Sequence, residues 1–170
     1  TLFDSSHIYA QDGDFDDVVV GSGSTVGFIT AQSTATLGIG TTAGCRLVRQ
    51  SMRAFSYQPG KSLQVLQTFV LNEPKENLTQ RVGYGSSENG VFLEQVDSQI
   101  NIIKRTSVSG TLTTITVPQS EWNIDTLDGT GFSTSNPSGV ALDLTKAQIL
   151  FSEYEWLGVG SVRVGFAIDG

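Results

Sequence analysis

Three stretches of the chain alternate apolar and polar residues with a period of two. The segment "SLQVLQTFVLN" places Leu63, Val65, Phe69 and Leu71 on one side, and "VRVGFAID" near the end of the chain repeats the pattern. In "QINIIKR", Ile100 and Ile102 alternate with Asn101, while Ile103 is expected on the second face. A strand shows such alternation when one face packs on a core and the other meets solvent or a neighbour. The pattern predicts antiparallel β-sheet.

Turn signals separate these stretches at intervals of roughly ten residues, as in sandwiches and barrels. They include "NEPKEN" at 72–77, "GSSENG" at 85–90, "VSG" at 108–110 and "LGVG" at 157–160. Helical patterning is confined to single turns expected at 118–122 and 143–148. We therefore predict an all-β fold, an antiparallel β-sandwich with jelly-roll connectivity over residues 46–170. Residues 1–45 are predicted to form an extended acidic amino-terminal arm or short strands.

The distribution of charge limits the range of partners. The formal net charge is -7, which argues against binding to nucleic acid, because a phosphate backbone requires clustered Lys and Arg. Residues 1–45 contain five Asp and no Lys or Arg, and Arg46, Arg49 and Arg53 follow directly. These arginines are interpreted either as members of surface ion pairs or as assembly contacts with an acidic partner, such as the Asp-rich leader of another copy. No apolar run is long enough to span a membrane, and no signal peptide is visible.

Metal and thiol chemistry have little support in the sequence. Cys45 and His7 are the single cysteine and the single histidine, so no intrachain disulfide forms and a zinc site would need carboxylates as well. The "DGDFDD" run at 12–17 suggests calcium, but it lacks the glycine and the glutamate of a calcium loop. A solvated acidic arm is the favoured interpretation, with a weak surface calcium site as the alternative. No metal and no cofactor are predicted.

The stretch "NIDTLDGTGFSTSNPSG" at 123–139 most resembles an active-site loop. Asp125 and Asp128 lie near Glu121, and a glycosidase needs two carboxylates across a sugar-sized gap, one of them with a raised pKa. Glu153 and Glu155 offer a second pair. The alternative is that Asp128-Gly129 is an ordinary tight turn within a crossing loop, and this interpretation is favoured. No catalytic residue is predicted.

Large aromatic residues suggest a sugar-binding face. Tyr57, Tyr84, Trp122, Tyr154 and Trp156 could stack on a glycan, with Tyr84 and Trp122 as the central pair. The alternative, which we favour, is that these rings fill the space between two sheets.

A series of blocks carries a family resemblance. They are "SMRAFSYQPGKSLQVLQTFVLN", "RVGYGSSENGVFLE", "INIIKRTSVSG", "QSEWNIDTLDGTG" and "LDLTKAQILFSEYEWLGVGSVRVGFAIDG". In this order they resemble a family of virion structural proteins from tailed, largely aquatic bacteriophages, with relatives in large DNA viruses. The resemblance covers about residues 49–170. It implies a particle component without enzymatic activity and with no catalytic residues. Members of this family usually continue past the "IDG" ending, so a processed or partial product of a longer polypeptide is expected.

Two main hypotheses follow. The first is a non-enzymatic viral structural protein, capsid-associated or in the tail, which is located in the virion and contacts copies of itself and other virion proteins. The second is a carbohydrate-binding, host-recognition module of a tail fibre or spike. A glycoside hydrolase is the third and least favoured alternative.

Overall fold

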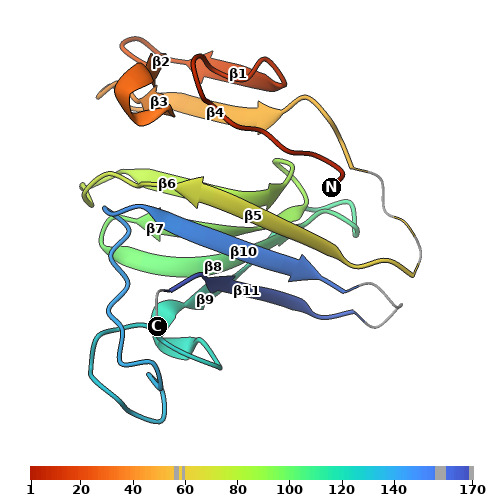
Figure 1. Cartoon of the computed structure of the whole chain (residues 1–170), viewed down its shortest axis with the longest axis vertical. Coiled ribbons are helices and arrows are strands. Elements are labelled where there is room, and N and C mark those ends of the chain that lie inside the picture. Colours follow the sequence, from red (N-terminus) through yellow and green to blue (C-terminus); the bar gives the residue numbers. More distant parts are fainter. Residues whose placement is uncertain (56–57, 59, 156–159, 169–170) are drawn as a thin grey trace. The chain divides into compact units, whose positions relative to one another are not determined.

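The computed structural model describes residues 1–55, 58, 60–155 and 160–168 (Figure 1). The chain divides into two units, Thr1–Tyr57 and Gln58–Gly170. The division falls after Tyr57 and not at residue 45, because strand β4 pairs with a strand of the first unit. Residues 1–45, predicted as an extended arm or short strands, therefore form short strands that pair within the first unit. Residues 157–159 of the turn expected at 157–160, and Trp156, lie outside the described residues.

The first unit contains two antiparallel strand pairs. Strand β1 (Phe15–Val20) pairs with β4 (Arg46–Ser51), and β2 (Thr25–Ile29) pairs with β3 (Thr34–Gly38) across the short 3-10 helix η1 (Thr30–Gln32). Aromatic rings pack beside β1: the ring centroid of Phe3 lies 5.9 Å from that of Phe15 and 5.5 Å from that of Phe55. This small cluster of half-buried rings stabilises a unit in which no described residue is fully buried.

The second unit is a β-sandwich of two antiparallel sheets. One sheet has the order β6 (Thr79–Gly85), β7 (Gly90–Val96), β8 (Gln99–Thr106) and β9 (Thr113–Pro118). The other has the order β11 (Val162–Phe166), β10 (Gln148–Tyr154) and β5 (Leu63–Phe69). The predicted all-β antiparallel sandwich is confirmed. Jelly-roll connectivity is not confirmed, because β6 to β9 follow one another as a meander, whereas Greek keys place non-consecutive strands side by side.

The core of the sandwich lies between these two sheets. Leu93 from β7 and Leu150 from β10 are buried at its centre, together with Leu71 and Leu144 from the flanking loops. Apolar side chains from both sheets surround these four residues: Phe69, Val82, Ile100, Ile102, Leu142, Val164 and Phe166, with Trp122 beside them. The apolar residues that recur with a period of two in the sequence thus include several that pack on this core.

The long connection from β9 to β10 begins with the 3-10 helix η2 (Gln119–Glu121), where a single turn was predicted. Leu127 and Leu144 are buried in this connection, and the backbone N–H of Leu71 donates to the carbonyl of Leu144 at 2.8 Å. The connection is therefore attached to the sandwich at defined points.

Candidate functional site

Asp125 in the loop between β9 and β10 organises its own loop. One carboxylate oxygen accepts the backbone N–H of Leu127 at 2.9 Å, and the other accepts that of Ser138 at 3.0 Å. Desolvation raises the pKa of Asp125, but these hydrogen bonds outweigh it, so the pKa lies below its ordinary value. The carboxylate joins two parts of the loop that are far apart in sequence.

Asp128 has a similar local role. Its carboxylate accepts from the hydroxyl of Thr130 at 2.7 Å and from the backbone N–H of Thr130 at 3.0 Å, and these bonds hold its pKa below the ordinary value. Glu121 is exposed in η2. A glycosidase acid needs a carboxyl whose pKa is raised by an apolar pocket, which is the opposite shift. The two aspartates are therefore arranged as turn-forming residues.

The sequence did not reveal two other polar residues that hold this loop. Asn136 is fully buried, and its backbone N–H donates to the hydroxyl of Ser133 at 2.9 Å. The side-chain amide of Gln119 donates to the carbonyls of Thr126 and Leu127, at 2.8 Å and 3.0 Å. The Asn-Pro-Ser-Gly sequence at 136–139 marks a turn, but nothing local indicates burial of the asparagine.

We expect Asp125→Ala to loosen the loop without unfolding the sandwich, because it removes the acceptor for Leu127 and Ser138. Limited proteolysis should cut between residues 129 and 139 several times faster, while Asp128→Ala, whose bonds are to the adjacent Thr130, should change the rate less. Because the folded pKa of Asp125 is lowered, its stabilisation is complete above the unfolded value of 3.8 and is lost as the pH falls through the folded value. A cleavage rate in wild type that does not rise below pH 3.8 would contradict this role.

The two aromatic residues predicted for a glycan face are half-buried and pack against other rings. Trp122 packs against the core cluster, and its ring stacks on Phe166 with centroids 6.3 Å apart. Tyr84 of β6 faces Tyr154 of β10 between the two sheets, with centroids 5.2 Å apart. Burial raises the pKa of both phenols. Trp122 and Tyr84 therefore contribute to packing within the sandwich. Tyr57 and Trp156 lie outside the described residues.

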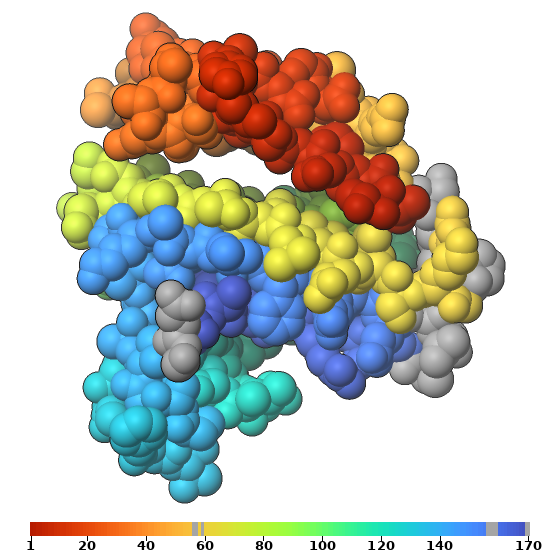
Figure 2. Space-filling model, in the orientation of Figure 1, coloured from red at the N-terminus to blue at the C-terminus, as the bar shows by residue number. Residues whose placement is uncertain are grey.

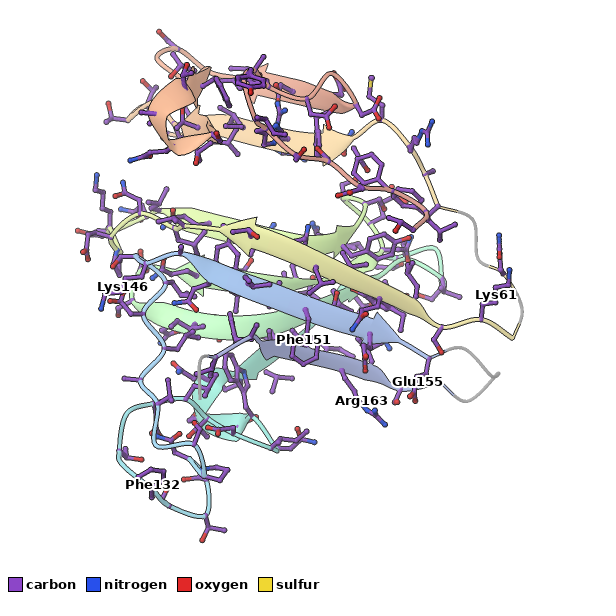
Figure 3. The ribbon with its side chains drawn as sticks, in the orientation of Figure 1. Lys61, Phe132, Lys146, Phe151, Glu155 and Arg163 are labelled. Carbon is purple, nitrogen blue, oxygen red and sulfur yellow. The ribbon has the colours of Figure 1, made fainter. Side chains whose placement is uncertain are left out.

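Glu153 and Glu155, the other candidate carboxylate pair, lie beside Arg163. Figure 3 labels Glu155 and Arg163. The guanidinium nitrogens of Arg163 are 3.9 Å from the Glu153 carboxylate and 3.6 Å from that of Glu155. These separations are those of loose, exposed ion pairs, which contribute little to stability.

The three arginines after residue 45 have different environments. Arg49 is almost buried, and its guanidinium lies 2.6 Å from the carboxylate of Asp17 and 4.7 Å from the ring centroid of Phe15. It therefore pairs within its own unit, as the ion-pair interpretation expected, and its guanidinium does not face an outside partner. Arg46 and Arg53 are exposed.

The remaining candidates of the first unit also have structural contacts. His7 packs against the rings of Phe15 and Phe28, and its ring nitrogen accepts the backbone N–H of Asp12 at 3.0 Å. The carboxylate of Asp12 accepts from Ser5 and from the backbone of Asp14. Among the described residues, no group of three or more His, Cys, Asp or Glu side chains could hold a metal ion.

Comparison with protein-family models, curated proteins and solved structures gave no match. No helix in the described part of the chain is long and apolar enough to cross a membrane.

Proposed function

We propose that the chain is a non-enzymatic structural component of a virus particle, which acts through self-association and contacts with other particle proteins. The observation that supports this most is the balance of apolar side chains. Among the described residues, six hydrophobic side chains are buried and twenty large hydrophobic ones are exposed. Single exposed apolar residues are common on proteins, but contiguous ones mark surfaces that bind a partner.

Several of these exposed residues gather on the outer face of the three-stranded sheet. Leu66 of β5, 64% exposed, lies opposite Phe151 of β10, and Ile149 and Val70 are exposed beside them. Figure 2 shows β5 in yellow next to β10 in blue. Phe151 lies over Gly165, where a Cβ atom would come within 2.7 Å of the ring. We call Leu66, Val70, Ile149 and Phe151 the apolar face.

A second exposed anchor lies in the β9–β10 loop, where Phe132 is 89% exposed (Figure 3). Interfaces are enriched in aromatic residues, which bury much surface for little loss of side-chain entropy. The apolar face and Phe132 suit protein contacts better than chemistry, whereas the candidate carboxylates form turns and exposed ion pairs. The glycan hypothesis loses support because Trp122 and Tyr84 are half-buried and pack against Phe166 and Tyr154.

The proposal is tested by locating the chain in purified particles of the virus that encodes it, with antibody labelling and mass spectrometry. We also expect Leu66→Asp to weaken association with particle proteins by about tenfold or more, because it places a charge in the centre of the apolar face. Ile124→Asp, which makes the same type of change at an exposed position in the β9–β10 loop, is the matched control. Absence of the chain from particles, or equal effects of the two variants, would contradict the proposal.

A further inference from the structure

Strand β9 lies at the edge of the four-stranded sheet and carries no charge. No charged residue occurs between Arg105 and Glu121, although the chain as a whole has 27 Asp, Glu, Lys and Arg residues. The sequence of β9 is TTITVP, and its first four residues are exposed. Natural edge strands are usually protected by charges, by proline, by a covering element or by a bulge, because an open edge pairs with other strands. The proline of β9, Pro118, is its last residue and leaves the rest of the strand free to pair.

The other three edges of the sandwich are protected. The side-chain amide of Gln67 in β5 donates to the carbonyl of Gly83 in β6 at 2.9 Å, so the edges of these two strands face each other. At the remaining edge, Arg163 of β11 lies near Glu153 and Glu155. Strand β9 has neither a facing strand edge nor a charged residue. Apart from its pairing with β8, no hydrogen bond from a described residue reaches the backbone of 113–118.

Pro118 indicates which backbone groups of β9 point outward. It lies opposite Asn101 of β8 but has no N–H to donate. We therefore infer that position 118 is one whose backbone groups face away from β8. In an antiparallel strand the direction of these groups alternates from residue to residue. Thr114 and Thr116 therefore direct their N–H and C=O groups to the open edge, and Ile115 directs its groups to β8.

We propose that β9 pairs with β9 of a second copy of the chain about a twofold axis, which joins the two four-stranded sheets into one of eight strands. Thr114 of each copy then lies opposite Thr116 of the other, and these residues exchange their N–H···O=C bonds. Ile115 lies on the axis, opposite its own counterpart. Leu112, which is exposed, lies opposite Pro118 of the other copy.

A second copy is the favoured occupant because the edge segment is uncharged and its register about Ile115 pairs like residues at most positions. Two copies of a chain with a net charge of -7 repel each other, and the repulsion is least where the touching segments are uncharged. Residues 106–120 are such a segment. In the antiparallel register around Ile115, isoleucine meets isoleucine, Thr114 meets Thr116 and Leu112 meets Pro118, and such cross-strand pairs are favourable. Thr113 meets Val117, a pair of two β-branched residues without charge.

The test uses the full chain with a charge introduced on the axis. Ile115→Lys places two ammonium groups opposite each other, and Ile115→Glu places two carboxylates there. We expect sedimentation equilibrium to show wild type as a dimer of the 18.2 kDa chain, and each variant alone to dissociate with a dissociation constant at least about tenfold higher. An equal mixture of the two variants should form the dimer again.

Ile124→Lys and Ile124→Glu are the matched controls, because Ile124 is an exposed isoleucine in the β9–β10 loop, outside both β9 and the apolar face. They should leave the dimer intact. If a charged variant at 115 does not fold by circular dichroism, Thr114→Pro serves instead, because it removes an outward N–H and keeps the bonds to β8. A monomeric wild type, variants that remain dimeric, or a mixture that stays monomeric overturns the inference.

This inference deepens the proposed function by naming a partner and an edge. The two fail separately. A chain found in particles but monomeric in solution would refute only the β9 pairing. A twofold dimer that is absent from particles would refute only the proposed role in a virion.

Discussion

Replacing Leu93 by alanine should lower the free energy of unfolding of the sandwich by about 3–5 kcal/mol. Leu93 is fully buried in β7, where it lies between Val82 of β6 and Ile102 of β8 on the same face of the sheet. Leu150 belongs to the same core cluster and comes from the opposite sheet. Alanine would leave a cavity that neighbours in two hydrogen-bonded sheets can fill only in part.

Chemical denaturation followed by intrinsic fluorescence measures this change, since Trp122 stacks on Phe166 at the core. The matched control is Leu66→Ala, which removes the same atoms from an exposed position and should change stability by about 0.5 kcal/mol or less. A similar loss for both variants would show that the core does not lie between the two sheets as described.

The strands of the sandwich could be predicted because their signal is local. Leu63, Val65 and Phe69 are spaced by even numbers in the sequence, and burial alternates along β5 with the same period. Leu66 and Gln67 depart from the sequence pattern, since the leucine is exposed and the glutamine is half-buried. Ile103 was expected on the second face of its strand, and it is buried there while Ile102 packs on the core. A strand with one face on a core requires this alternation, so the sequence carries it directly.

The boundary of the first unit could not be predicted in the same way. Strand β4 was assigned to the sandwich, but it pairs with β1, and Arg49 lies opposite Asp17, far away in sequence. Pairing between distant strands leaves no periodic signal within either strand. The same reason hid the contacts of Asp125 with Ser138 and of Trp122 with Phe166.

The same limit applies to the candidate site. The sequence shows which residues are of the types found in catalytic or sugar-binding sites. It does not show where their side chains point in the folded protein. Asp125 and Asp128 accept backbone hydrogen bonds that only the folded loop supplies. Pro118 is an exception. Because proline has no backbone N–H, its position in β9 indicates from the sequence which backbone groups of the strand face away from β8.

We expect Asp17→Ala to unfold the first unit and leave the sandwich folded. The Arg49 side chain is 9% exposed and that of Asp17 is 23% exposed, and their charged atoms lie 2.6 Å apart across β1 and β4. Removing Asp17 leaves the nearly buried Arg49 guanidinium with only the carbonyl of Asp12 and the ring of Phe15 as partners. Breaking a fully buried pair costs about 3–5 kcal/mol, and we expect a loss near the lower end of this range. A unit of 57 residues has little more stability than that to lose.

Hydrogen exchange followed by mass spectrometry separates the two units in one experiment. Protection of 15–20 and 46–51 should disappear in Asp17→Ala, while that of 90–96 and 148–154 stays as in wild type. Asp16→Ala, at the exposed neighbouring position of β1, should change neither region. The double variant Asp17→Leu/Arg49→Met should recover most of the protection, since replacing a whole buried pair by apolar groups of similar size is close to neutral. Loss of protection in both units of Asp17→Ala would mean that the sandwich depends on the first unit for its stability.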